Sequence, residues 1–447
     1  MNWEFYDEKK KELFANYKYK LICSKNYRRL DGKTQLFSSD KGDHFRNRMI
    51  HTAEVREIAV KISNKINEEF VKIFNEKIIN TDLVECIAIA HDFGHTPFGH
   101  IGERTLQQIV SNDDLLGGLL CKNTNRKKLF FKHNINSLRL LVEEFGKGIP
   151  WEILDGVLKH SKLSYNKDQD NGVSNIISGI EYDKIFYKFK ESKNPLTIEG
   201  QIVAIADEVA QRYSDFEDTF RAKNINILKK QISIMQIELS DYEEERCIKY
   251  IDRICSNLIE SIVKQSIYNL ENIIKNGLFN HDFNAVLSNR IVITFDSEGI
   301  KLNNTLEDFI KECIFNIDEL RKIDEKNKYV IRQLFKAYYN NCFQITGEYF
   351  TKFIKKLNKL KNKLEFNDDT KEKYCNLLSI SFVNGNKIDY KKFDEFIIEL
   401  KKVDFDLENK DENLTKLFFE YIRLIVFYIA SMTDKYALDC YKFLYEV

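Results

Sequence analysis

The segment HDFGHTPFGHIGE, residues 91–103, decides the prediction for this chain because it gathers metal-binding side chains within a short stretch. The 447-residue chain contains 8 histidines, and three of them, His91, His95 and His100, lie in this segment beside Asp92. Chance explains such clustering poorly. Imidazole nitrogens and carboxylate oxygens bind zinc, manganese, iron or magnesium, and an adjacent His–Asp pair lets one helix end supply two ligands. The remaining ligands must come from other helices.

A short apolar helix is predicted directly before this segment. We expect Thr81 or Asp82 to cap the helix LVECIAIAHD, residues 83–92, because short polar side chains accept hydrogen bonds from the free N–H groups of a first turn. Gly94 and Pro97 then stop the helix. The HD pair is therefore expected at a helix C-terminus.

Three further amphipathic helices are predicted, and two of them carry candidate ligands. His51 lies in the first turns of a helix over 48–70. Asp207 lies in the apolar run IVAIADEVA of a helix over 199–222, where an unpaired carboxylate would be costly. A bound cation would remove that cost, so Asp207 is a candidate ligand. The third helix spans 129–145.

The composition predicts a globular, mainly α protein. Hydrophobic residues make up 43% of the chain, which is enough to bury a sizeable core and argues against disorder. Only 3 Pro and 17 Gly interrupt long charged segments rich in helix-forming residues.

The charge balance and the cysteines exclude several classes of protein. Lys plus Arg equals Asp plus Glu at 69 each, so no global field attracts nucleic acid or an anionic membrane. The N-terminal stretch is charged and no run approaches the ~20 apolar residues of a membrane span, so we expect a cytoplasmic protein without a membrane partner. The 9 Cys include no CxxC pair and are expected to be reduced and mostly buried.

The candidate ligands occur in the order H…HD…D, which resembles the HD superfamily of metal phosphohydrolases. Residues 91–103 resemble the HDLGHxPFGHxGE signature of one branch, the deoxyguanosine triphosphate triphosphohydrolase (dGTPase) family. Further segments similar to this family are YRRLDGKTQLF (27–37), RNRMIH (46–51), ADEVAQRYSDFED (206–218) and ASMTDKYAL (430–438). The likeness runs from about residue 27 to the end, although 223–420 matches only loosely.

The resemblance implies a domain organisation and a set of metal ligands. It implies an HD-domain helical bundle over residues 1–222 and an additional helical C-terminal region, 223–447, which completes the pocket and provides oligomer contacts. The positions that match the family's metal ligands are His51, His91, Asp92 and Asp207.

The resemblance also implies catalytic and substrate-binding residues. His100 matches the acid that protonates the departing 5′ oxygen, and Glu103, on the same helical face, matches the carboxylate that orients it. The positions that match substrate-binding residues are Gln35 for the sugar 3′ hydroxyl, Arg48, His95 and His133 for the phosphates, and Asp215 in the substrate pocket.

The implied reaction is hydrolysis of a deoxynucleoside triphosphate (dNTP) at the α-phosphorus, which releases a deoxynucleoside and triphosphate. The implied cofactor is a divalent metal, namely manganese, magnesium or iron. Members of the family commonly form homo-oligomers, often hexamers, and some are regulated by nucleotides or single-stranded DNA.

The chain departs from the family at three positions. Gln211 stands where bacterial relatives often have Tyr, Ser214 where His is common, and Ser431 where Gly is usual. None of these positions is a predicted ligand. These three differences put the selection of the base or the sugar in question.

Two alternative functions stay open. One is an HD phosphohydrolase that acts on another nucleotide or on a monophosphate. The other is a nucleotide-sensing or nucleic-acid-binding regulator with an inactive site. Intact His100, Glu103 and metal-ligand positions argue against an inactive site, because sequence drift would not spare every one of them.

Other polar residues are given structural interpretations. His160, in an apolar helical stretch, is interpreted as a core residue. The second HD dipeptide, His281–Asp282, lacks the glycine-rich sequel and is interpreted as a loop or helix cap. The basic segment 122–128 is interpreted equally well as a solvated loop or as a contact for phosphate or single-stranded DNA.

Overall fold

The computed structural model of the protein describes residues 8–35, 46–111, 113–114, 116, 131–161, 194–221, 244–276, 290–315, 318–345, 347–385, 387–406 and 411–446. In this part of the chain the regular structure is helical, apart from one small sheet and an isolated bridge between Thr34 and Asn47. In the sheet, β1 (Val383–Asn384) pairs antiparallel with β2 (Lys387–Ile388). The prediction of a mainly α protein is confirmed. None of the described helices combines the length and apolar character that a bilayer crossing requires.

The chain divides into two compact units. The first comprises Met1–Gly99, His133–Tyr165 and Asp183–Glu325, and the second comprises His100–Lys132, Asn166–Tyr182 and Lys326–Val447. The predicted metal ligands all lie in the first unit. The domain boundary after residue 222 stays a prediction.

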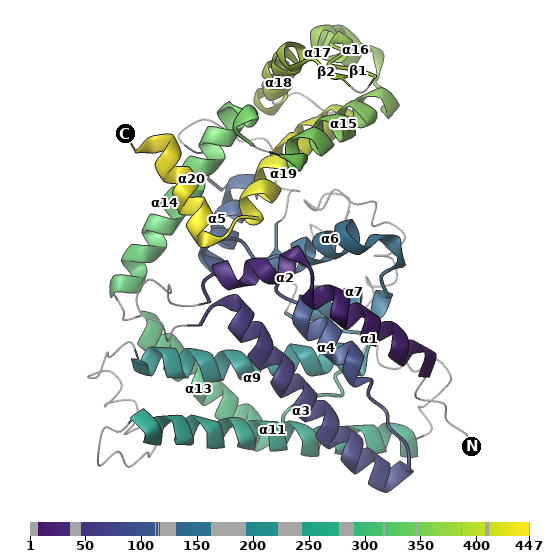
Figure 1. Ribbon diagram of the computed structural model, residues 1–447, viewed down its shortest axis with the longest axis vertical. Helices are drawn as coiled ribbons and strands as arrows, with labels where there is room; N and C mark the ends of the chain where they lie inside the picture. The colour runs from purple at the N-terminus through teal and green to yellow at the C-terminus, as the bar shows by residue number, and fades with distance from the viewer. Residues whose placement is uncertain are drawn as a thin grey trace. The chain divides into compact units, whose positions relative to one another are not determined.

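The first unit is a bundle of helices in which α3 lies beside α9 and α4 (Figure 1). α4 also contacts α1, α7 and α9. Its helices are α1 (Glu8–Ile22), α2 (Lys25–Arg29), α3 (Arg48–Phe74), α4 (Thr81–Ala90), α6 (His133–Phe145), α7 (Trp151–Lys159), α9 (Ile198–Arg221), α11 (Glu244–Lys275) and α13 (Ser297–Phe315), with 3₁₀ turns η1 (Leu30–Gly32) and η5 (Gly146–Gly148).

Helix α4 is packed on all sides, as its apolar sequence requires. Seven of its 10 residues are buried apolar side chains. Helix α7 approaches so closely that a Cβ atom at Gly156 would lie 2.6 Å from the Ile87 side chain. The end of α4, where His91 is the C-cap residue, is therefore held on a firmly packed element.

All four predicted helices are present, as α3, α4, α6 and α9. The predicted cap of α4 is wrong by one residue. The side chain of Asn80, not that of Thr81 or Asp82, accepts a hydrogen bond from the Leu83 N–H at 3.2 Å, because Asn80 is the residue with extended backbone.

The second unit is also helical and contains an aromatic core. Phe382 contacts Phe396 at a ring-centroid distance of 4.7 Å and Phe393 at 5.2 Å. Its helices are α5 (Gly99–Ser111), the larger part of α14 (Asp318–Asn340), α15 (Glu348–Lys363), α16 (Asp368–Lys373), α17 (Cys375–Ser379), α18 (Tyr390–Phe405), α19 (Glu412–Ala430) and α20 (Asp434–Tyr445), with the 3₁₀ turn η8 (Cys342–Gln344).

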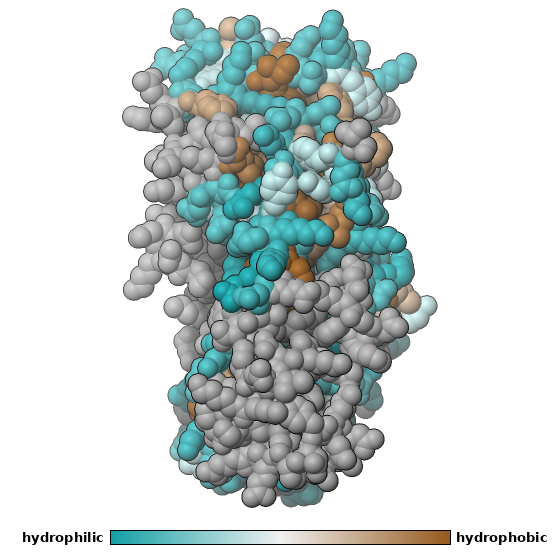
Figure 2. Space-filling view, turned by 90° about the vertical axis from the view of Figure 1, so that its left-hand side faces the viewer, coloured by the Kyte–Doolittle hydropathy of each residue, from teal (hydrophilic) through white to brown (hydrophobic). Residues whose placement is uncertain are grey.

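The surface has the character expected of amphipathic helices that face solvent. On the face drawn in Figure 2, the described residues are mostly hydrophilic, and hydrophobic residues are interspersed among them.

Candidate metal centre

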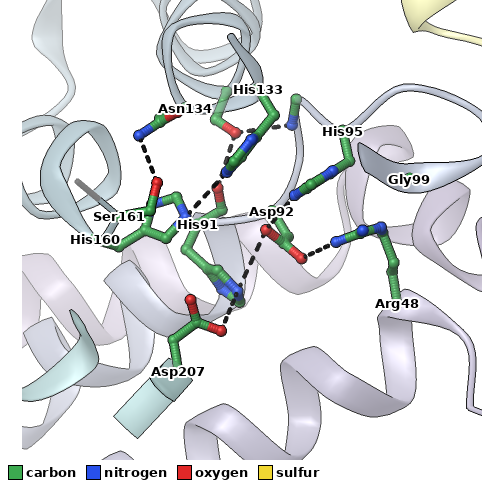
Figure 3. Close-up of polar contacts among 12 residues, drawn as sticks. Arg48, His91, Asp92, His95, Gly99, His133, Asn134, His160, Ser161 and Asp207 are labelled. Atoms are coloured by element: carbon green, nitrogen blue, oxygen red, sulfur yellow. Dashed lines mark hydrogen bonds and ion pairs between the residues drawn. The ribbon is translucent and has the colours of Figure 1, made fainter. Parts of the chain in front are cut away.

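The first unit brings the four predicted ligands together from three helices. His51 lies in the first turn of α3, whose N-terminus is fixed by a hydrogen bond from the Ile50 N–H to the Asn47 side chain at 3.0 Å. His91 and Asp92 follow α4, and Asp207 lies within α9. Figure 3 shows the carboxylates of Asp92 and Asp207 directed toward the His91 imidazole.

Ligand atoms of His51, His91 and Asp92 lie within 4.8 Å of one another, as around one ion, and Asp207 lies close to the two histidines. The Oδ1 atom of Asp207 lies 3.0 Å from His51 Nε2 and 3.8 Å from His91 Nε2. His91 Nε2 lies 3.5 Å from Asp92 Oδ1. Ligand atoms about 2.1 Å from an ion are about 3.0 Å apart at adjacent octahedral positions, about 3.4 Å apart in a tetrahedron and about 4.2 Å apart when opposite. All three distances fall within this range.

The His91 imidazole supplies the test of whether a metal fits. Its Nδ1 atom lies 2.6 Å from the Ala88 carbonyl oxygen, and since a carbonyl only accepts, Nδ1 carries the proton. In the neutral imidazole, Nε2 therefore presents its lone pair to two carboxylates. It is buried and has no hydrogen-bond partner among the described residues. A lone pair that faces anionic oxygens is unfavourable unless a proton or a metal ion lies between them, and at 3.5 and 3.8 Å neither carboxylate is hydrogen-bonded to this nitrogen. The donor set therefore fits a divalent metal.

The electrostatics around Asp92 keep it ionised. Arg48 donates from its Nη1 atom to Asp92 Oδ2 at 2.7 Å, and His95 Nε2 lies 3.0 Å from Asp92 Oδ1. Burial alone would raise the pKa of Asp92, but the electrostatic influence of His95, His91 and Arg48, together with the hydrogen bond from His95, outweighs burial and holds this pKa well below its usual value. An ionised carboxylate is the form that binds a metal.

Asp207 and His51 are coupled in the same way. Burial would raise the pKa of Asp207, but the hydrogen bond from His51 and the electrostatic influence of His91, His51 and His160 lower it. Burial would lower the pKa of His51, but the hydrogen bond to Asp207 and the charges of Asp207 and Asp92 raise it. The pair therefore places an ionised carboxylate next to an imidazole on facing helices, and His51 must release the Nε2 proton to bind a metal through this atom.

The loop after α4 is fixed to helix α6 by polar contacts. The Ser137 hydroxyl accepts from the Gly94 N–H at 2.8 Å and donates to the His91 carbonyl at 2.9 Å. The Asn136 side-chain amide donates to the Gly94 carbonyl at 2.8 Å. A Cβ atom at Gly94 would lie 2.1 Å from the His133 carbonyl oxygen, so only glycine allows this approach. These contacts set the position of the metal-binding loop.

His95 and His133 lie against each other beside the ligands. Their rings are stacked, with centroids 3.9 Å apart and an interplanar angle of 19°. Lys33 is buried, and its Nζ atom donates to the His95 carbonyl oxygen. Both histidines therefore lie beside the predicted metal ligands, and their contact with the phosphates stays a prediction.

His160 is also part of this cluster, which the sequence interpretation as a core residue did not anticipate. Its Nε2 atom lies 3.3 Å from His133 Nε2, and its ring centroid lies 5.0 Å from that of His91. The approach of α7 to α6 creates this contact. No local sequence pattern reports a contact between helices.

Gln35 and Arg48 both lie close to Gly99. A Cβ atom at Gly99 would lie 3.0 Å from Arg48 Nη2 and 3.7 Å from the Gln35 carbonyl oxygen, and Gly99 has a φ of +58°. The side-chain oxygen of Gln35 and the Nε and Nη2 atoms of Arg48 are buried without a hydrogen-bond partner among the described residues. These atoms have the free hydrogen-bonding capacity that a polar ligand would use.

Asp215 lies two turns after Asp207 on α9 and is buried. Burial raises its pKa to about 7, assisted by the negative charge of Asp218 and opposed by His51, Arg212 and Arg46. The ionised form is therefore disfavoured in the folded protein.

The predicted acid and its partner lie in the other unit. His100 and Glu103 are both on α5, where His100 is exposed and Glu103 is buried. Their roles stay predictions. His281, Asp282 and the segment 122–128 lie outside the described residues.

Comparisons with known proteins place this site in a family. A family model for the HD domain matches residues 48–212, a range that starts at Arg48 and includes all four predicted ligands. A deoxyguanosinetriphosphate triphosphohydrolase-like protein of Rickettsia felis is 30% identical over 335 residues, which cover 71% of this chain and 77% of that protein. The chain belongs to the family of deoxyguanosinetriphosphate triphosphohydrolase-like proteins with an HD domain.

Two further relatives extend the match. The deoxyguanosinetriphosphate triphosphohydrolase-like protein of Clostridium tetani is 29% identical over 363 residues, which cover 80% of this chain and 82% of that protein. The protein of the same name from Bartonella quintana is 28% identical over 346 residues, which cover 72% and 76%. The resemblance of residues 91–103 to the dGTPase family is thereby confirmed, and this family member is a metal-dependent phosphohydrolase of the HD type.

Proposed function

We propose that the protein hydrolyses dNTPs to deoxynucleoside and inorganic triphosphate, with a divalent metal bound by His51, His91, Asp92 and Asp207. The observation that carries the proposal is the buried His91 Nε2 lone pair, which faces two carboxylates. The names of the relatives supply the substrate class. Manganese, magnesium and iron all suit this mixture of imidazole and carboxylate ligands.

The bound metal would supply hydroxide at neutral pH by lowering the pKa of its water from 15.7 toward ~7. The remaining work falls to protein side chains that bind and orient the substrate. Arg48 is buried beside Asp92 and retains donors with no described partner, so it is the residue that neutralises the phosphates. His95 and His133, whose rings stack on each other beside Asp92, contact the phosphates together with Arg48.

Two further side chains are assigned to substrate recognition. The buried side-chain oxygen of Gln35 accepts a hydrogen bond from the sugar 3′ hydroxyl. The buried carboxyl of Asp215, whose pKa is raised to about 7, forms part of the substrate pocket. The departures at Gln211, Ser214 and Ser431 bear on base or sugar choice.

His100 is proposed as the acid that gives a proton to the departing 5′ oxygen, and Glu103 as the carboxylate that orients it. The support is their spacing on α5, where residues three apart share a helical face. An imidazole donates a proton best when its other nitrogen is held by a partner.

The proposal extends to the organisation of the protein. The HD core spans 1–222, and the helical region 223–447 completes the pocket and forms contacts in a homo-oligomer such as a hexamer. A regulatory nucleotide or single-stranded DNA is a proposed further partner, and the cytoplasm is the proposed location. The alternatives are an HD phosphohydrolase for another nucleotide and a regulator with an inactive site.

A panel of dNTPs and ribonucleotides tests the proposed function. Each nucleotide is incubated with manganese, magnesium or iron, and nucleoside and triphosphate are measured separately from monophosphate and pyrophosphate. We expect deoxynucleoside and triphosphate from dNTPs. Loss of turnover with retained nucleotide binding in His100→Ala supports its role as the acid. Wild-type protein that is inert toward every nucleotide with every metal would instead favour the regulator.

A further inference from the structure

A second group of potential ligands lies beside the first and shares Asp92 with it. Asp92, His133 and His160 each offer one ligand atom, and these three atoms lie within 4.8 Å of one another. All three residues are buried. His133 begins α6 and His160 ends α7, so the group draws on elements that contribute nothing to the first set.

The orientation of His160 is that of a metal ligand. Its Nδ1 atom lies 2.7 Å from the Val157 carbonyl oxygen, so Nδ1 donates the proton and Nε2 carries the lone pair. His91 is held in the same way by Ala88. A backbone carbonyl that fixes the outer nitrogen is the usual support for a metal-bound histidine. Figure 3 shows His160 and His133 directed toward each other, next to Asp92.

The distance between the two imidazoles suits a shared ion. His160 Nε2 and His133 Nε2 are 3.3 Å apart, which lies between the about 3.0 Å and about 3.4 Å separations of adjacent ligands in octahedral and tetrahedral sites. A direct hydrogen bond from His133 to His160 would also account for this distance. The Asp92 ligand atom, which lies within 4.8 Å of both nitrogens, adds the negative charge that a shared cation requires.

We propose that Asp92, His133 and His160 bind a second divalent cation, with Asp92 shared between two ions. Two nitrogens and one carboxylate oxygen select a transition metal such as Mn²⁺, Fe²⁺ or Zn²⁺ rather than Ca²⁺. In two-metal sites the ions are about 3.5–4 Å apart, close enough for both to act on one phosphate. The inference rests on the proposed function for the first ion and adds a site to it.

The test is a count of bound Mn²⁺ in protein freed of metal by a chelator and then titrated with Mn²⁺ alone. Equilibrium dialysis with elemental analysis gives the stoichiometry, and electron paramagnetic resonance shows whether neighbouring Mn²⁺ ions are coupled. We expect two ions per wild-type chain and a coupled spectrum. His160→Ala is expected to keep one ion and lose the coupling, and His51→Ala to lose the other ion.

The matched control is His281→Ala, which removes the histidine of the second HD dipeptide and is expected to leave both ions and the coupling unchanged. His160→Asn is a second variant that lacks a basic nitrogen but fills more of the space. Far-UV circular dichroism and thermal melting check that each variant folds. Should neither His160 variant fold, the wild-type stoichiometry and spectrum decide the matter.

Binding of one Mn²⁺ per wild-type chain, or two ions that survive in folded His160→Ala, would overturn the inference. Its failure is distinguishable from failure of the proposed function. Turnover of dNTPs with one bound ion refutes only the second site. Two coupled ions without turnover of any dNTP refute only the proposed function.

Discussion

Replacing Gly94 with alanine is expected to displace the loop that carries Asp92. The added Cβ atom would lie 2.1 Å from the His133 carbonyl oxygen and 2.2 Å from the Ser137 nitrogen, whereas ordinary contact begins at 3.4 Å. These are backbone atoms of α6, so no side chain can rotate away. The loop or the helix must therefore move by about 1.3 Å, and a shift of about 1 Å in a site can cost about 10²-fold in rate.

The same displacement breaks the contacts that hold the loop. It separates Gly94 from Ser137 and Asn136, which now hold its N–H and carbonyl groups. We expect metal affinity to fall by about 10–100-fold, as for the loss of supporting contacts around a metal site. The free energy of unfolding should fall by about 1–3 kcal/mol or more, the usual cost of overpacking.

Calorimetric titration with Mn²⁺ and thermal melting of the metal-free protein measure both effects. Gly148→Ala is the matched control, since a Cβ atom there meets nothing within 4 Å. It should change the free energy of unfolding by less than about 0.5 kcal/mol. Gly94→Ala protein that melts and binds Mn²⁺ like the wild type would refute the described packing of the loop on α6.

Three further predictions concern neighbouring residues. The pKa of Asp215 is raised to about 7, above the unfolded value of about 3.9, so ionisation of Asp215 lowers the stability of the folded protein as the pH rises through this window. The melting temperature of Asp215→Asn relative to the metal-free wild type should therefore increase from pH 5 to pH 8. A difference that does not depend on pH would contradict this. Ser137→Ala leaves the buried Gly94 N–H without its partner, and urea unfolding should show a loss of about 1–3 kcal/mol; an unchanged midpoint and slope would count against the contact. Arg48→Lys keeps the positive charge but not the forked donors of the guanidinium, so kcat/KM for dNTPs should fall by about 10²-fold while Mn²⁺ still binds. An unchanged kcat/KM would show that Arg48 does not bind the phosphates.

The helices that carry the site were predictable because their signals are local. The apolar run before His91 and the stop at Gly94 and Pro97 place the HD pair at a helix end, where the structure has it. The apolar surroundings of Asp207 identified it as a carboxylate that needs a partner. The cap of α4 was missed by one residue because several adjacent polar side chains can cap, and only the backbone conformation selects Asn80.

The contacts between helices could not be predicted in this way. His160 follows an apolar helix and has the sequence context of a core residue, but the packing of α7 near α6 brings it to His133. Ser137 and Asn136 are ordinary helix residues in sequence, and their function in holding the loop depends on the close approach that Gly94 allows. Each of these features depends on tertiary structure.

The most direct test of the central claim is triphosphate release from a dNTP by metal-free protein titrated with Mn²⁺, compared between the wild type and Asp207→Asn. We expect no release without metal, release that rises with Mn²⁺ in the wild type, and a rate lower by about 10²-fold or more in the variant. Full-speed release by metal-free protein, or an Asp207→Asn variant as active as the wild type, would contradict it.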